Sequence, residues 1–259
     1  MLDNMNTRTQ KHTSRRRALI TGASSGTGAA AAFALAETHE LVLVGRRSER
    51  LSEVARSVRV GGGKAETIVF DLTTGDCEKL IATAGPITDL VCAAGLNTPQ
   101  RAWADQKFAE FEAIVSTNLT SVAALITSAL PALRAASGSV AVVSSLSAWT
   151  LQKGAGVAYR ASKSALRALT ESLNEQEADH GVRASLICPG EIDSEFLALR
   201  PSVPDETRRQ RMLSPQDIGD VIAYVMRAPR HLRVDEMVVS PLGTIERGLS
   251  ALEVAASRS

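Results

Sequence analysis

Aromatic residues and cysteines are scarce in this chain. Only 3% of its 259 residues are aromatic, so a buried core has to be built from alanine, valine, leucine and isoleucine. The three cysteines, Cys77, Cys92 and Cys188, are odd in number, far apart and never in a CxxC pair. This spacing argues against a disulfide framework or a zinc site. We expect three buried small residues rather than a reactive thiol.

Long apolar runs and an excess of one charge are also lacking. The longest apolar run, residues 29–36, is far shorter than the roughly 20 residues that cross a bilayer. Basic residues number 29 and acidic residues 28, so the net charge of +1 favours neither nucleic acid nor a membrane as partner. The polar stretch 1–14 is predicted to be a disordered tail and not a signal peptide. We therefore expect a cytoplasmic protein.

Metal-ligand spacing is missing as well. The four histidines, His12, His39, His180 and His231, are scattered through the chain without the spacing of a metal site. We interpret all four as surface residues and expect no metal.

Short apolar segments alternate with helical patterns between residues 18 and 240. The segments are compact and rich in β-branched residues, as expected for strands covered on both faces. The expected strands are 17–21, 40–44, 65–70, 89–93, 139–144, 183–187 and 236–239. Strand–helix alternation predicts an α/β fold with a single doubly wound parallel sheet in three α/β/α layers. We expect one domain at 15–245, preceded by the tail 1–14 and followed by a C-terminal tail at 246–259.

Two of the helical patterns are apolar on more than one side. They cover residues 108–133 and 158–178, and each carries small or apolar side chains around most of the helix. Helices of this kind are usually covered on several sides. We interpret them as a subunit interface; a larger intramolecular core is the alternative.

A glycine-rich turn follows the first expected strand. The segment Thr21–Gly28 has the sequence TGASSGTG and precedes an alanine-rich helix. Glycine allows the positive φ of a tight turn and lets backbone N–H groups approach a phosphate. The following helix N-terminus favours the negative charge of a pyrophosphate. This placement predicts a dinucleotide site.

The end of the second expected strand carries arginine where an acid is usual. Dinucleotide folds normally present a carboxylate to the adenosine ribose about 20 residues after the glycine turn. Here Gly45, Arg46 and Arg47 occupy that place. Two guanidinium groups can pair with a 2′-phosphate, which predicts NADP(H); solvated surface arginines are the alternative. Asp71, after the third strand, is a candidate partner for the adenine amino group.

Tyr159 and Lys163 are four residues apart at the start of a helical pattern, so they share a helix face. A tyrosine with its ordinary pKa near 10 is a poor base at neutral pH. An ammonium group roughly 4 Å away would lower that pKa by about three units. The pair therefore predicts an acid–base group in which Lys163 assists Tyr159.

With these motifs, the sequence from residue 17 to 240 resembles a short-chain dehydrogenase/reductase of the single-domain type, which has a Rossmann fold. The TGxxxGxG turn and the YxxxK pair are both matched in full. The family's serine falls at Ser145, with Ser144 and Ser147 as alternatives, and its helix asparagine falls at Asn118. The segment Pro189–Gly190, with Ile192 and Ser194, matches the one that touches the nicotinamide.

The resemblance implies a hydride transfer between NADP(H) and a carbonyl or alcohol substrate. Tyr159 would exchange the proton, Ser145 would bind the substrate oxygen, Lys163 would hold the nicotinamide ribose, and Asn118 would fix a water in a proton relay. The family commonly forms homodimers or homotetramers. The cofactor contacts that the resemblance and the residues together predict are Gly22, Ser24, Ser25, Gly26, Thr27, Gly28, Arg46, Arg47, Asp71, Leu72, Ala94, Gly95, Tyr159, Lys163, Pro189, Gly190, Ile192 and Ser194.

The chain departs from the family pattern at two places. The usual Asn-Asn-Ala-Gly after the fourth strand is Cys92-Ala93-Ala94-Gly95, and the frequent Asp-Gly-Gly near the end is replaced from Ser240 onward. Neither change touches the expected reacting groups.

Two alternatives to an oxidoreductase are a non-catalytic dinucleotide-binding regulator and a methyltransferase-like enzyme. The intact serine, asparagine, tyrosine and lysine set argues against the first. A methyltransferase would have no use for the Tyr–Lys pair.

The segment 195–212 is expected to cover the active site. Its apolar residues could line a pocket, and its arginines could meet an acidic substrate or form a solvated face.

Overall fold

A computed structural model describes residues 15–152 and 154–242. Its centre is one sheet of seven parallel strands in the order β3-β2-β1-β4-β5-β6-β7. The strands are β1 (Arg16–Thr21), β2 (His39–Gly45), β3 (Lys64–Val69), β4 (Asp89–Cys92), β5 (Ser139–Val143), β6 (Arg183–Pro189) and β7 (Glu236–Val239). The predicted parallel, doubly wound sheet is confirmed. The tails predicted at 1–14 and 246–259 lie outside the described residues.

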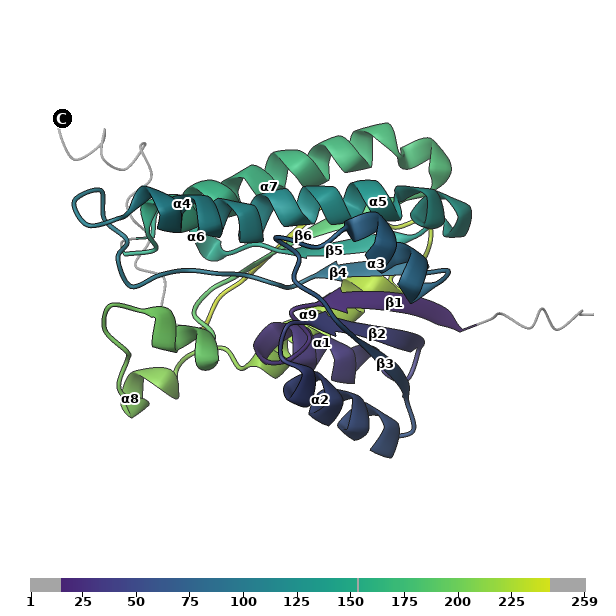
Figure 1. Cartoon of the computed structure of the whole chain (residues 1–259), viewed down its shortest axis with the longest axis horizontal. Coiled ribbons are helices and arrows are strands. Elements are labelled where there is room, and N and C mark those ends of the chain that lie inside the picture. Colours follow the sequence, from purple (N-terminus) through teal and green to yellow (C-terminus); the bar gives the residue numbers. More distant parts are fainter. Residues whose placement is uncertain (1–14, 153, 243–259) are drawn as a thin grey trace, which may run out of the picture.

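Helices cover both faces of the sheet and make three layers (Figure 1). The helices are α1 (Gly26–Leu35), α2 (Ser48–Val60), α3 (Cys77–Ala84), α4 (Phe108–Val115), α5 (Ser121–Ala136), α6 (Leu146–Trp149), α7 (Val157–Gln176), α8 (Glu206–Arg209) and α9 (Pro215–Arg227). Three short helical turns complete the set: η1 (Ser116–Thr120), η2 (Ala178–His180) and η3 (Glu195–Leu199). Helices α1, α2 and α9 lie on one face, and α3, α5 and α7 on the other.

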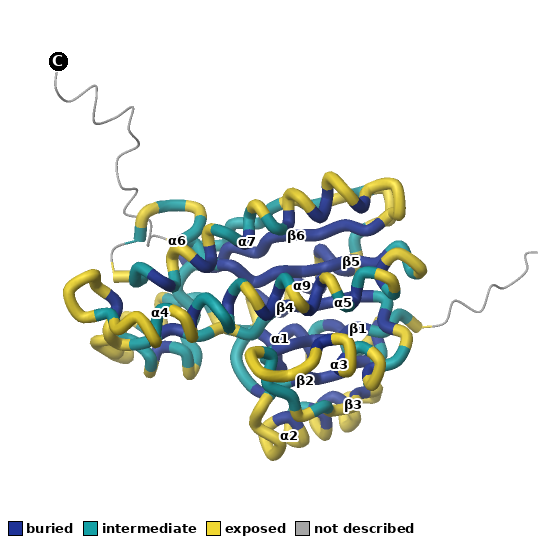
Figure 2. Tube along the Cα trace, turned by 45° about the horizontal axis from the view of Figure 1, so that its top comes forward, coloured by how far each residue is buried: buried dark blue, intermediate teal, exposed yellow. Residues whose placement is uncertain are grey.

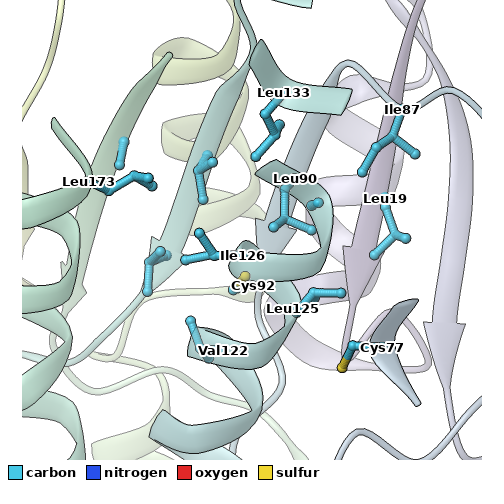
Figure 3. Close-up of a cluster of buried hydrophobic side chains, with 14 of the residues drawn as sticks. Leu19, Cys77, Ile87, Leu90, Cys92, Val122, Leu125, Ile126, Leu133 and Leu173 are labelled. Carbon is cyan, nitrogen blue, oxygen red and sulfur yellow. The ribbon is translucent and has the colours of Figure 1, made fainter. Parts of the chain in front are cut away.

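Each face of the sheet has its own apolar core, and the strands β1, β2, β4, β5 and β6 between them are mostly buried (Figure 2). The edge strands β3 and β7 are partly exposed. Figure 3 shows Val122, Leu125 and Ile126 of α5 beside Leu90 of β4. The cysteines Cys77, Cys92 and Cys188 are all buried and free, as predicted. Because burial raises the pKa of Cys92 to about 12, its thiol stays protonated at neutral pH.

Helix α4, the π-helical turn η1 and α5 form one run from Phe108 to Ala136. By length and composition alone this run could cross a membrane. Instead its residues Val122, Leu125 and Leu133 pack against the sheet. The opposite side of the run is exposed, so the predicted use of this helix as a subunit interface stays a prediction.

His39 corrects one expectation, because it is buried and not a surface residue. Its Nε2 lies 3.4 Å from Oδ2 of Asp89, which is fully buried and also pairs with Arg16. Burial raises the pKa of Asp89, but hydrogen bonds from His39, Arg16 and Thr88 outweigh it and leave that pKa below its ordinary value. The three side chains tie together the amino-terminal ends of β1, β2 and β4, at the edge away from the glycine turn. Sequence spacing does not reveal this contact, because the strands meet only in the folded sheet.

The strand order reverses between β1 and β4. In open parallel sheets, ligands bind where the carboxyl ends of strands leave a crevice at such a reversal. The loops after β1, β4, β5 and β6 all open at this edge.

Candidate active site

A cavity of about 640 Å³ lies at the carboxyl edge of the sheet. Seventeen of the eighteen predicted cofactor contacts line the cavity, and so does Ser145. On the glycine-turn side it is lined by Gly22, Ser24, Ser25, Gly26, Thr27, Arg46, Arg47, Asp71 and Leu72. On the Tyr159 side it is lined by Ala94, Gly95, Ser145, Tyr159, Lys163, Pro189, Gly190, Ile192 and Ser194. Two predicted residues, Gly28 and Asn118, lie behind this lining.

The glycine turn leaves no room for side chains at two of its positions. Gly22 has a φ of +67°, and a Cβ there would lie 2.8 Å from the backbone nitrogen of Ala94. At Gly28 a Cβ would lie 2.4 Å from the carbonyl oxygen of Gly22, so this glycine lets α1 pack against the turn. Gly26, with a φ of +52°, faces open space, where a Cβ would meet only the Cβ of Ser194 within 4 Å.

Arg47 is folded over the glycine turn. Its guanidinium donates to the Ser24 hydroxyl at 3.0 and 3.2 Å and to the Ser25 hydroxyl at 2.6 Å. It also forms an ion pair of 3.1 Å with Glu195, which pairs with Arg50 as well. The cation thus stands between the turn and the segment after β6.

Arg46 is more exposed and lies 3.8 Å from the carboxylate of Asp71. That carboxylate accepts hydrogen bonds from the backbone and side chain of Thr73, which hold the pKa of Asp71 below its ordinary value. Both predicted residues therefore stand at the rim of the same cavity.

Three serines follow β5, and their hydroxyl groups have different hydrogen-bond partners. The Ser144 hydroxyl donates to the backbone carbonyl of Lys163 at 2.9 Å and is buried. The Ser145 hydroxyl accepts from Ser147 at 3.0 Å and hydrogen-bonds Tyr159. Of the three candidates, Ser145 is the one in contact with the tyrosine.

The pKa of Tyr159 moves in the direction opposite to the one expected from the Tyr–Lys pair alone. Burial raises it, against the lowering effects of the Ser145 hydrogen bond and of the cations Arg101 and Arg200. The Lys163 ammonium lies 5.9 Å from the centre of the tyrosine ring and donates to the carbonyl oxygen of Val143 at 2.7 Å. Burial lowers the pKa of Lys163 to about 8.

Asn118 lies in the π-helical turn η1 and is fully buried. Its amide oxygen accepts from the backbone nitrogen of Leu96 at 2.7 Å, and its amide nitrogen donates to the carbonyl of Leu96 at 2.9 Å and to Ser162 at 3.2 Å. The side chain therefore fixes the segment after β4. A Cβ at Gly95 would meet both Lys163 Nζ, at 3.7 Å, and Asn118 Oδ1, at 3.8 Å.

The segment after β4 is held by Thr21 despite the missing asparagine. The Thr21 hydroxyl accepts from the backbone nitrogens of Ala93 and Ala94 at 3.2 and 3.4 Å and donates to Val91 at 3.3 Å. A threonine hydroxyl on the neighbouring strand thus supplies polar anchoring at this point of the sheet.

Sequence reasoning missed Arg101, a buried cation of the cavity wall. Arg101, in the loop between β4 and α4, is 9% exposed and lines the cavity near Tyr159. No motif surrounds it. Phe196, which the sequence placed in the covering segment, packs beside Tyr159 with ring centres 6.0 Å apart.

The volume and charge of the cavity suit a dinucleotide. Its volume is within the range of about 300 to 1,000 Å³ that is usual for ligand pockets. The glycine turn opens toward it at Gly26, the N-terminus of α1 follows the turn, and Arg46 and Arg47 add positive charge at the end of β2.

Comparison with known proteins gives relatives over most of the chain. A family model described as short chain dehydrogenase matches residues 16–202. An uncharacterized oxidoreductase of Staphylococcus saprophyticus is 32% identical over 233 residues, which cover 87% of this chain and 97% of the relative. An uncharacterized oxidoreductase of Listeria innocua is 31% identical over 242 residues, which cover 86% and 95%.

Solved structures share the fold. A metagenomic short-chain oxidoreductase in complex with NADP is 31% identical with a TM-score of 0.74, covering 88% of this chain and 97% of the other. An alcohol dehydrogenase from the archaeon Thermococcus sibiricus, complexed with 5-hydroxy-NADP, is 26% identical with a TM-score of 0.77 and the same coverage.

Proposed function

The chain belongs to the short-chain dehydrogenase family and is an oxidoreductase by that membership, and we propose that it transfers a hydride between NADP(H) and a carbonyl or alcohol substrate. One observation carries the proposal: Tyr159, Ser145 and Lys163 line the same cavity as the glycine turn and its arginines. A proton donor and a dinucleotide site thus open into one space.

The cavity residues at the glycine turn and at the ends of β2, β3 and β6 would hold the cofactor. The glycine turn and the α1 N-terminus bind the pyrophosphate, and Arg46 and Arg47 bind the 2′-phosphate. Asp71 and Leu72 contact the adenine, while Pro189, Gly190, Ile192 and Ser194 contact the nicotinamide. When bound, NADPH supplies the hydride that reduces the carbonyl carbon. The two NADP-containing neighbours support this choice of cofactor.

The proton comes from Tyr159. In reduction its hydroxyl protonates the oxygen of the carbonyl, giving an alcohol, and in oxidation its phenolate removes the alcohol proton. Ser145 donates a hydrogen bond to the same oxygen and stabilises its developing negative charge. The raised pKa of Tyr159 keeps the proton on the phenol, which suits the direction of reduction.

Lys163 and Asn118 support this step. Lys163 holds the nicotinamide ribose, and its positive charge favours the phenolate after Tyr159 has given up its proton. Asn118 holds the Leu96 segment beside Lys163, where a water would relay a proton from solvent.

We further propose that residues 15–245 act as one domain, that the protein is cytoplasmic, and that it works as a homodimer or homotetramer. The described part of the chain supports the first point, because one sheet runs through it.

A substrate screen that follows the loss of NADPH absorbance tests the proposal. Oxidation of NADPH that depends on an added aldehyde or ketone is expected. Tight binding of NADP(H) without turnover across a broad panel would instead identify a dinucleotide-binding regulator.

A further inference from the structure

Arg101 is a buried cation in the wall of the cavity. It is 9% exposed, and its guanidinium donates to three backbone carbonyls, those of Thr98 at 2.6 Å, Gly154 at 3.2 Å and Leu199 at 2.6 Å. Carbonyl oxygens satisfy hydrogen bonds but do not neutralise a charge. Within residues 15–152 and 154–242, no carboxylate lies within 4 Å of this guanidinium. A buried charge without a counter-charge is costly unless something compensates it.

Other cations near Arg101 add to the positive charge that lacks a counter-charge. Burial lowers the pKa of Arg101, and the nearby cation of Arg200 lowers it further. Arg200 and Arg208 line the same cavity, and both pair with the single carboxylate of Glu191, at 2.7 and 3.0 Å. Arg200 and Arg208 therefore share one carboxylate, and among the described residues Arg101 is left without one at this end of the cavity.

Arg101 and Arg200 also stand close to the reacting group. Both cations oppose the rise in the pKa of Tyr159 that burial causes, although they do not cancel it. Phe196, which packs beside Tyr159, and Leu197 supply apolar surface to the same cavity. A ligand that contacts Tyr159 therefore meets an apolar wall and excess positive charge together.

We propose that the substrate is a carbonyl compound with an apolar body and an anionic group, such as a carboxylate, that pairs with Arg101 and Arg200. This inference rests on the proposed function, because it assigns the substrate class of the same site. The alternative is that Arg101 only ties three loops together through its carbonyl contacts.

The packing around Arg101 allows its guanidinium to bind a substrate anion as well as the three backbone carbonyls. Gly156 has a φ of +96°, and a Cβ there would lie 3.0 Å from the Cβ of Arg101, so the glycine makes room for the arginine stem. The guanidinium has five N–H groups, of which three carbonyl bonds use three. The remaining donors can take a carboxylate oxygen.

Two probes that differ at one group, a carboxylate in the first and its neutral methyl ester in the second, test the inference: 4-formylbenzoate and methyl 4-formylbenzoate, each reduced with saturating NADPH. We expect kcat/KM for the acid to exceed that for the ester by about ten- to hundred-fold, the range of one charge-assisted hydrogen bond. In Arg101→Met and in Arg200→Gln the ratio should fall toward one, whereas Arg101→Lys should retain part of it. Arg211→Gln is the matched control, because it removes an exposed arginine from the same covering segment and should keep the ratio.

The ratio separates substrate binding from loop support. If Arg101→Met lowers both probes equally and leaves the ratio unchanged, or if the unmodified protein shows a ratio near one, the inference is wrong while the oxidoreductase proposal stands. If NADPH is not oxidised with either probe, the inference is tested by equilibrium binding of both probes to the NADP⁺-saturated protein. Acid binding at least ten times tighter than ester binding, lost in Arg200→Gln, supports the inference; equal affinities overturn it.

Discussion

Tyr159 lies in an environment that holds its proton in place. Burial raises its pKa, and the groups that oppose this, Ser145, Arg101 and Arg200, come from three separate loops. A phenol that stays protonated at neutral pH is ready to donate to a developing alkoxide. Alcohol oxidation needs the phenolate, so it depends more heavily on the surrounding cations.

Substitution of Tyr159 by phenylalanine should lower turnover at least about 100-fold, the usual scale for loss of a general acid or base. The ring still packs beside Phe196, so cofactor affinity should be preserved. Steady-state kinetics and NADPH fluorescence titration measure the two effects. The chain offers a matched control, because its other tyrosine, Tyr224, is exposed on α9 and Tyr224→Phe should change neither. Retention of more than a tenth of the activity in Tyr159→Phe would remove this tyrosine from the proton step.

The cofactor preference should be for NADP(H), with kcat/KM about ten- to thousand-fold above that for NAD(H). Charge-assisted bonds from Arg46 and Arg47 to the 2′-phosphate supply the difference. Because Arg46 is exposed, we expect the ratio of the two kcat/KM values to lie toward the low end of this range. The double variant Gly45→Asp with Arg46→Ala should shift the preference toward NAD(H). A Cβ at Gly45 meets its neighbours no closer than 3.5 Å, so the aspartate fits. Equal kcat/KM values for both cofactors on the unmodified protein would contradict this prediction.

The residues of the cavity differ in how visible they are in the sequence. The glycine turn and the Tyr–Lys pair are local patterns with fixed spacing, so they can be read without a structure. Arg101 reaches the cavity by a loop fold that brings residues 98, 154 and 199 together. Glu195 likewise forms ion pairs with Arg47 and Arg50, which precede it in the sequence by 148 and 145 positions. Contacts of this length leave no periodic signal.

At the scale of elements, the contact between α1 and α9 depends on one glycine. A Cβ at Gly219 would lie 2.7 Å from the backbone carbon and oxygen of Ala30. In an ordinary helix, replacing glycine by alanine stabilises the helix by about 1 kcal/mol. Here we expect the reverse: Gly219→Ala should lower the free energy of unfolding by about 1 to 3 kcal/mol, because it overpacks the helix contact. Urea unfolding measures the change.

A second glycine provides the comparison for this prediction. Gly61, at the end of α2, would place a Cβ 3.5 Å from its nearest neighbour, which is an ordinary contact. Gly61→Ala should therefore leave the stability unchanged or raise it. If Gly219→Ala raises the stability too, the α1–α9 contact is more adaptable than its spacing indicates.

Element types were predictable from the sequence because strands and helices have different apolar periods. The last strand, Glu236–Val239, was predicted with its exact observed bounds, and the other strands differ by one or two residues at an end. The π-helical turn η1 was not predictable. Its change of register is accompanied by hydrogen bonds between Asn118 and Leu96, two residues joined only by the fold.

At the scale of the molecule, the two faces of the helix run 108–136 have different chemistry. One face packs on the sheet, while the other exposes small residues, Ala109, Ala113, Thr120, Ala124 and Thr127, at helical spacing. Helix α7, its neighbour, also exposes the small residues Ala161, Ser164 and Ala168. Small side chains let a second helix approach closely, which suits pairing with a copy of the same surface across a two-fold axis.

We therefore expect a dimer or tetramer at micromolar concentration, measured by light scattering. A stable interface needs roughly 800 Å² on each partner, which two adjacent helices of this length can supply. Ala124→Arg places a long cation in the centre of the expected contact and should shift the protein toward monomers. Ser52→Arg, at an exposed position of α2 on the opposite face of the sheet, adds the same charge and should leave the mass unchanged. A monomeric unmodified protein, or dissociation by both variants alike, would show that these helices face solvent.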